Sequence, residues 1–75
     1  MASELIFRLH VEREAAMRYY QGKAQAVITR AENGQTLRFP AIHIRRFINQ
    51  NGIQGRFLIR FDDKHKLVDL QRIGD

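Results

Sequence analysis

The sequence predicts a small α+β fold, with an antiparallel sheet of about five strands and two short helices in the order β-α-β-β-α-β-β. Apolar and polar residues alternate in residues 5–10 and 55–61, as in half-buried strands. An Asn33-Gly34 pair separates two further strand-like runs. The 75 residues are enough for one domain, residues 1–75. A bent, partly closed barrel is the alternative geometry for strands joined by short turns.

Residues 5–20 predict a strand followed by a helix. The inward residues of the strand at 5–10 are Leu5, Phe7 and Leu9. Glu14 and Arg18 then have the i,i+4 order that stabilises a helix, and Gly22 is a typical residue just after a last helical turn. We therefore expect a helix over about 11–20. Its inward side chains are expected to be Ala16, Tyr19 and Tyr20.

The segment "KAQAVITRAENGQTLRF" predicts a β-hairpin with strands at about 24–31 and 35–39. Asn33-Gly34 readily adopts the positive φ angles of a type I′ turn, whose twist matches that of the flanking strands. Pro40 is expected to end the second strand because it has no N–H group to donate.

The second half of the chain predicts a short helix and two more strands. Apolar residues at helical spacing indicate a helix over about 41–48, which are Ala41, Ile44, Phe47 and Ile48. Gly52 and Gly55 are expected to bracket a tight loop from which Ile53 enters the core. In residues 55–61 the expected inward side chains are Phe57, Ile59 and Phe61, and the outward ones are Arg56, Leu58 and Arg60. The last strand is expected at about 66–73.

Positive charge is unevenly distributed along this chain. The net charge is +5, from 13 basic and 8 acidic residues, and no Asp or Glu lies between Glu32 and Asp62. Ten of the basic residues are arginines, whose planar guanidinium groups bind phosphate and carboxylate in a forked geometry. We expect the arginines of this acid-poor region to lie off the core and to form a binding face. The candidate binding residues are Arg38, Arg45, Arg46, Arg56 and Arg60.

Two functions fit such a face. The first is sequence-tolerant binding of nucleic acid through its phosphates. The alternative is a protein-interaction module, either a homodimer or an adaptor for an acidic protein, because arginine is also enriched at protein interfaces. Exposed apolar residues beside the arginines favour the alternative, and the candidates are Val27, Ile42 and Leu58.

Catalysis, cofactors and membrane insertion are not expected from this sequence. There is no cysteine, and the only serine, Ser3, lies near the N-terminus, where the chain is expected to be frayed. His10, His43 and His65 lie on different predicted elements, so no metal site is expected. No phosphate-loop or dinucleotide motif indicates a cofactor or a small-molecule substrate. The absence of a signal peptide or long apolar run predicts a cytoplasmic protein.

Four short motifs resemble those of a known family. They are "YYQG" at 19–22, "FPA" at 39–41, "RRF" at 45–47 and "GIQGRF" at 52–57. Together they resemble a family of short bacterial proteins, domain-of-unknown-function family 2835, over about residues 7–73. The resemblance implies a small intracellular bacterial protein. It implies no catalytic or binding residue, because the family has no assigned activity.

Overall fold

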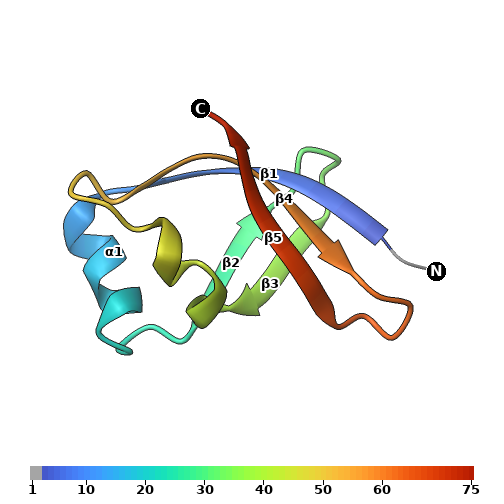
Figure 1. Cartoon of the computed structure of the whole chain (residues 1–75), viewed down its shortest axis with the longest axis horizontal. Helices are drawn as coiled ribbons and strands as arrows, with labels where there is room; N and C mark the ends of the chain where they lie inside the picture. The colour runs from blue at the N-terminus through green and yellow to red at the C-terminus, as the bar shows by residue number, and fades with distance from the viewer. Residues whose placement is uncertain (1–2) are drawn as a thin grey trace.

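The computed structural model describes residues 3–75, and within them five strands, one α-helix and two 3-10 helices (Figure 1). In chain order they are β1 (Ser3–Val11), α1 (Arg13–Tyr20), β2 (Ala26–Arg30), β3 (Thr36–Pro40), η1 (Ala41–His43), η2 (Arg45–Phe47), β4 (Ile53–Phe61) and β5 (Leu67–Gly74). The predicted α+β class and the five antiparallel strands are confirmed.

The five strands form two sheets instead of one continuous sheet. Strands β1, β4 and β5 form a three-stranded sheet in the order β1-β4-β5, and β2 pairs with β3 in a separate hairpin. The two sheets meet near the end of β2, where Phe7 forms a bridge with Ala31 and the Glu32 N–H donates to the Ile6 carbonyl at 2.7 Å. Within residues 3–75 the strands do not close into a barrel.

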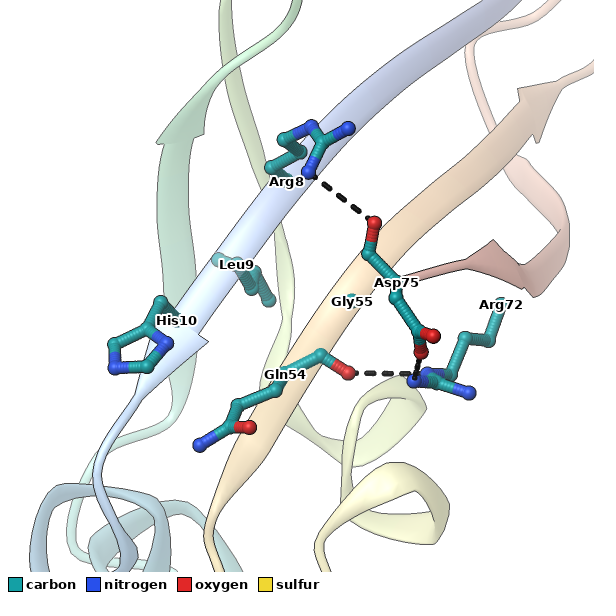
Figure 2. Close-up of a pocket in the computed structure, with 7 residues that line it drawn as sticks. All are labelled: Arg8, Leu9, His10, Gln54, Gly55, Arg72 and Asp75. Atoms are coloured by element: carbon teal, nitrogen blue, oxygen red, sulfur yellow. Dashed lines mark hydrogen bonds and ion pairs between the residues drawn. The ribbon is translucent and has the colours of Figure 1, made fainter.

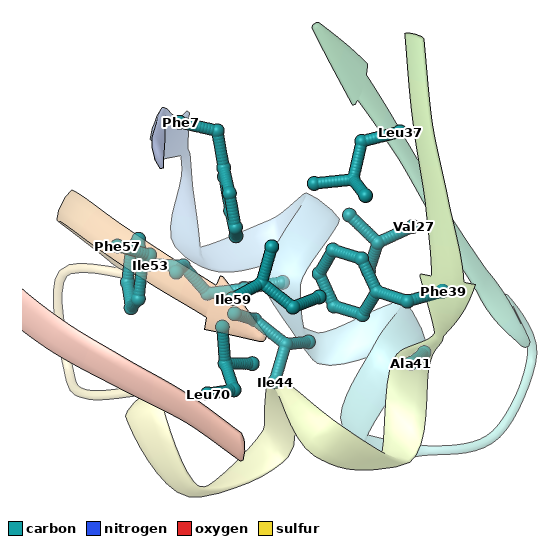
Figure 3. Packing of buried hydrophobic residues seen from close by; sticks show 11 residues of the cluster. Phe7, Val27, Leu37, Phe39, Ala41, Ile44, Ile53, Phe57, Ile59 and Leu70 are labelled. Carbon is teal, nitrogen blue, oxygen red and sulfur yellow. The ribbon is translucent and has the colours of Figure 1, made fainter. Parts of the chain in front are cut away.

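The core lies between the three-stranded sheet and the hairpin and is covered at one end by α1, η1 and η2 (Figures 1 and 3). Phe7 contacts aromatic rings from both sheets, with ring centroids 5.6 Å from Phe39 and 5.4 Å from Phe57. Phe57 and Ile59 are fully buried, and Phe61 is half-buried, so the predicted orientation of β4 is confirmed. Ile53 also lies in the core, as expected.

Two residues have the opposite exposure to the one predicted. Tyr20 was expected to face inward but is 62% exposed, because the last turn of α1 borders an open surface groove with Met17 and Ile48. Val27 was expected to be exposed but is buried, because it lies directly across from the buried Phe39 in the hairpin. The neighbouring Ile28 is the exposed residue of β2. The alternation of β2 is therefore shifted by one residue from the one predicted.

The helix predicted over 41–48 is replaced by the two 3-10 helices η1 and η2. The Ile44 N–H donates to the Ala41 carbonyl and the Phe47 N–H to the Ile44 carbonyl, both at 3.0 Å. These are i,i+3 bonds, and the apolar residues repeat every three positions, which matches the three residues per turn of a 3-10 helix. Ala41 and Ile44 are buried as predicted, whereas Phe47 and Ile48 are half-buried.

The hairpin turn is not of type I′. Gly34 has a φ of +92°, but Asn33 does not have a positive φ. The Gly34 N–H donates to the Ala31 carbonyl at 2.9 Å, and the Ala31 N–H donates to Gln35 at 2.8 Å. This pattern is the three-residue loop with a glycine bulge. Gly55 also differs from the prediction, because it lies within β4 and not in a loop.

Candidate interaction surfaces

Two of the five candidate arginines bind main-chain carbonyls of their own chain. Arg45 Nε donates to the Tyr19 carbonyl at 2.9 Å, near the end of α1, where helical carbonyls lack intrahelical partners. Arg46 donates to the Leu70 carbonyl on β5, and its guanidinium lies 4.7 Å from the ring centroid of Phe47. Both arginines therefore connect η2 to neighbouring elements, Arg45 to α1 and Arg46 to β5, although Arg46 is exposed.

The two candidate arginines of β4 are paired with carboxylates. Arg56 donates to both carboxylate oxygens of Glu32, at 2.8 and 2.7 Å. This hydrogen bonding lowers the pKa of Glu32 and raises the pKa of Arg56. Arg60 Nε lies 3.7 Å from a carboxylate oxygen of Glu4 on the adjacent strand. The absence of acids near these arginines in the sequence therefore does not leave them unpaired in space.

Arg38 is separated from the other four. It lies on the outer side of the hairpin, directly across from the exposed Ile28, and Arg30 is on the same side. Among residues 3–75, neither Arg30 nor Arg38 has a side-chain hydrogen bond or ion pair. The five candidate residues thus occupy three different parts of the molecule.

The outer face of the three-stranded sheet, hereafter the outer face, carries three rows of side chains that run across the strands. Residues that are paired in register share a face of the sheet. One end row contains Glu4, Arg60 and Asp69, the middle row contains Ile6, Leu58 and Gln71, and the other end row contains Arg8, Arg56 and Gly74. Ile6 and Leu58 are half-buried but do not belong to the core cluster. On the outer face, the apolar side chains of the middle row therefore lie between two end rows that carry charged side chains.

A cleft of about 410 Å³ lies between the ends of β1, β4 and β5 (Figure 2). Arg72 donates from Nε to the Gln54 carbonyl at 3.0 Å and from a terminal nitrogen to the Asp75 carboxylate at 2.6 Å. Arg8 donates to the main-chain oxygen of Asp75 at 3.2 Å. The remaining lining residues are Leu9, His10 and Gly55.

Sequence reasoning missed this cleft, although the alternation in residues 5–10 puts Arg8 on the side opposite the core-facing Leu5, Phe7 and Leu9. Arg8 and Arg72 are separated by 63 intervening residues, and only the pairing of β1 and β5 with the central β4 brings them together. The one sequence signal was Gly55 within an alternating strand pattern, which marks a close approach of another group to the backbone.

The other predicted apolar surface residue, Ile42, is 62% exposed, as expected. It borders a second groove, of about 290 Å³, with Val68 and Arg46. None of the helices in residues 3–75 is long and apolar enough to cross a membrane. The same residues contain no group of three or more His, Asp or Glu side chains placed to hold a metal ion.

These features define a small α+β protein whose three-stranded sheet packs one face on a shared core and exposes a charged outer face. The chain belongs to the family described as protein of unknown function (DUF2835), whose sequence model matches residues 3–73. The resemblance seen in the sequence motifs is confirmed. No curated protein and no solved structure matches this chain.

Proposed function

We propose that this protein is a non-catalytic protein-interaction module that associates with a second copy of itself through the outer face. The observation that carries this proposal is the order of the three rows. The row of Glu4, Arg60 and Asp69 has one more acid than base, and the opposite end row contains Arg8 and Arg56. If the negative charge of Glu32 is added to the row of its partner Arg56, the net charge of that row is still +1.

This arrangement is self-complementary. A two-fold axis along the middle row turns one outer face onto the other and reverses the direction of the strands, as in an isologous dimer. The end row with net negative charge then lies over the end row with net positive charge of the second copy. Glu4 is opposite Arg8, and Arg60 is opposite Arg56, where each of these two arginines keeps the carboxylate partner of its own chain. Ile6 and Leu58 meet their own copies at the centre, so the half-buried apolar pair loses its remaining contact with water.

The internal pairing of the arginines also supports a protein partner over nucleic acid. Four of the five candidate arginines already donate to, or lie beside, oxygen atoms of their own chain. A carboxylate-paired arginine attracts phosphate less strongly than a free one, because the neighbouring negative charge opposes the approach of another anion. Paired charges remain well suited to electrostatic matching across a protein interface.

Light scattering of the wild-type chain and two variants tests this proposal. Leu58→Glu places a charge at the centre of the outer face, and we expect it to reduce the mass from twice 8.8 kDa to 8.8 kDa. Ile28→Glu, an equally drastic change on the hairpin, is the matched control and is expected to remain dimeric. A wild-type mass of 8.8 kDa at every concentration up to about 1 mM would rule the dimer out. A dimer that does not form at about 1 mM has an association free energy weaker than about −4 kcal/mol.

Nucleic-acid binding is a second candidate, favoured by the absence of own-chain partners for Arg30 and Arg38 among the described residues. It predicts affinity that falls with salt, with a log–log slope of about −0.7 to −0.9 per phosphate contacted. Arg38→Glu should then weaken binding to all sequences alike. The absence of any salt-dependent binding at low ionic strength would eliminate this candidate.

For either function, we propose that the protein acts in the bacterial cytoplasm, consistent with a cysteine-free sequence.

A further inference from the structure

We propose that the cleft between Arg8 and Arg72 binds the phosphoryl group of a small phosphomonoester, and that Asp75 occupies this site when no ligand is bound. The inference does not rest on the proposed dimer. It starts from the fact that both guanidinium groups donate to one residue, Arg8 to the main-chain oxygen of Asp75 and Arg72 to its carboxylate (Figure 2). The two guanidinium groups therefore border the same small space, which Asp75 occupies.

Asp75 is held loosely in this position. Its side chain is 99% exposed, and among residues 3–75 its carboxylate contacts only Arg72. Ion pairs between such exposed groups contribute little to stability, because water screens them and the side chains lose freedom. Arg8 donates to a main-chain oxygen of Asp75 at 3.2 Å, which is at the long end of the range for hydrogen bonds. An anion that forms shorter hydrogen bonds with both guanidinium groups would displace Asp75.

The two arginines favour a dianion over a monocarboxylate. A phosphomonoester carries close to two negative charges at neutral pH and presents three acceptor oxygens, which suits two forked donors. Glu32 lies 4.0 Å from Arg8, but its shorter contacts, at 2.7 and 2.8 Å, are with Arg56. The Arg8 guanidinium therefore keeps most of its capacity to bind a ligand.

The shape of the cleft also fits a small ligand. Its volume of about 410 Å³ exceeds that of a phosphate alone and lies in the range of about 300–1,000 Å³ typical of small-molecule sites. Gly55 has no side chain, so Arg72 lies directly against the β4 backbone at this cleft. Leu9 and His10 line the side toward β1, so the organic part of a phosphomonoester has both apolar and polar surface to contact.

The test is an NMR titration of the ¹⁵N-labelled full chain with phenyl phosphate, inorganic phosphate and acetate in a buffer free of other oxyanions. We expect saturable shifts of the amides of His10, Gln54 and Gly55, with acetate weaker than phosphate. Arg72→Gln should weaken phosphate binding by about tenfold or more, because it removes a charged donor pair. Asp75→Asn should strengthen it several-fold.

Control variants that change a charge away from the cleft distinguish binding at a specific site from general electrostatic attraction of phosphate. Arg60→Gln removes an arginine at the far end of the outer face, and Asp63→Asn removes an acid in the β4–β5 turn, so neither should change the affinity. If these variants act like Arg72→Gln and Asp75→Asn, the cleft is not a site. Shifts that grow linearly without saturation would also overturn the proposal.

Two further variants keep the test independent of folding and of the dimer. If Arg72→Gln melts early because its bond to the Gln54 carbonyl is lost, Arg8→Gln replaces it and should weaken phosphate at least severalfold. Unchanged binding by a folded Arg8→Gln would contradict the two-arginine site. The Leu58→Glu variant, in which no second copy places Glu4 opposite Arg8, should bind phosphate at least as tightly as the wild type. A wild-type protein that is monomeric but binds phosphate saturably would disprove the dimer alone.

Discussion

Arg72 lies across Gly55, which has a φ of +145°, and a Cβ at Gly55 would be only 2.6 Å from Arg72 Nε and 2.8 Å from the Gly74 carbonyl. The close approach of β5 to β4 at this point therefore depends on the absence of a side chain. The same contact places the Arg72 guanidinium at the cleft. A glycine in the middle of a strand thus couples the packing of β5 to the geometry of the candidate anion site.

We predict that Gly55→Ala lowers the free energy of unfolding by about 2–4 kcal/mol, since it adds a steric clash to backbone strain. Gly34→Ala is the matched control, because Gly34 also has a positive φ, of +92°, but no atom of the described residues 3–75 lies within 4 Å of an added Cβ. The free energy of unfolding of Gly34→Ala should be only about 1 kcal/mol lower than that of the wild type. Denaturant unfolding of both variants measures the difference. Equal losses would show that β5 does not pack tightly on Gly55.

Phe57→Ala should lower the free energy of unfolding by about 3–5 kcal/mol, enough to threaten the fold of so small a domain. Phe57 is fully buried, and its ring centroid lies 5.4 Å from that of Phe7 and 5.1 Å from that of Phe47. Phe61→Ala, at the half-buried end of the same strand, should lower the free energy of unfolding by clearly less than Phe57→Ala does. A Phe57→Ala variant that unfolds like the wild type would contradict the assigned register of β4.

The pair of Glu32 and Arg56 makes stability depend on pH. Hydrogen bonding to Arg56 lowers the pKa of Glu32 below its ordinary value of 4.5, so the folded state binds this proton less readily than the unfolded state. The stabilisation is therefore complete above pH 4.5 and is lost as the pH falls through the lowered pKa of the folded state. Glu32→Gln should be less stable than the wild type at pH 7 and closer to it at pH 3, by thermal unfolding. A constant difference across this range would contradict the pairing.

Arg45→Ala should lower the free energy of unfolding by about 1–2 kcal/mol, because it removes a charged donor from the Tyr19 carbonyl at the end of α1. Arg38→Ala, on the outer side of the hairpin, should change it by no more than about 0.5 kcal/mol. Thermal or denaturant unfolding compares the two. If both variants match the wild type, the bond between Arg45 and α1 contributes nothing to the fold.

The sequence predicted the strands whose two faces differ most. In β1 and β4 the outward positions include Arg8, Arg56 and Arg60, whereas the inward positions carry large apolar residues, so the inward side of each strand was identified correctly. In β2, Val27 and Ile28 are both β-branched and apolar, so alternation could not indicate which of them faces the core. The 3-10 helices were mistaken for an α-helix, since apolar residues three apart are compatible with both.

The candidate surfaces were less predictable, because they depend on contacts between distant segments. Local periodicity placed Arg56 and Arg60 off the core, but it carried no information on Glu32 and Glu4, which pair with them across strands. In the same way, no local pattern linked Arg72 to Arg8. Strand order, which the sequence left open, decides both the rows of the outer face and the cleft.

The measurement that tests the central claim most directly is sedimentation equilibrium of two charge-reversal variants, alone and mixed. In the proposed dimer Glu4 faces Arg8 of the second copy, so Glu4→Arg alone and Arg8→Glu alone should each be monomers near 8.8 kDa. An equimolar mixture restores both opposite-charge contacts and should sediment as a heterodimer of twice that mass. Variants that remain dimeric when alone, or a mixture that remains monomeric at concentrations where the wild type is a dimer, would contradict association through the outer face.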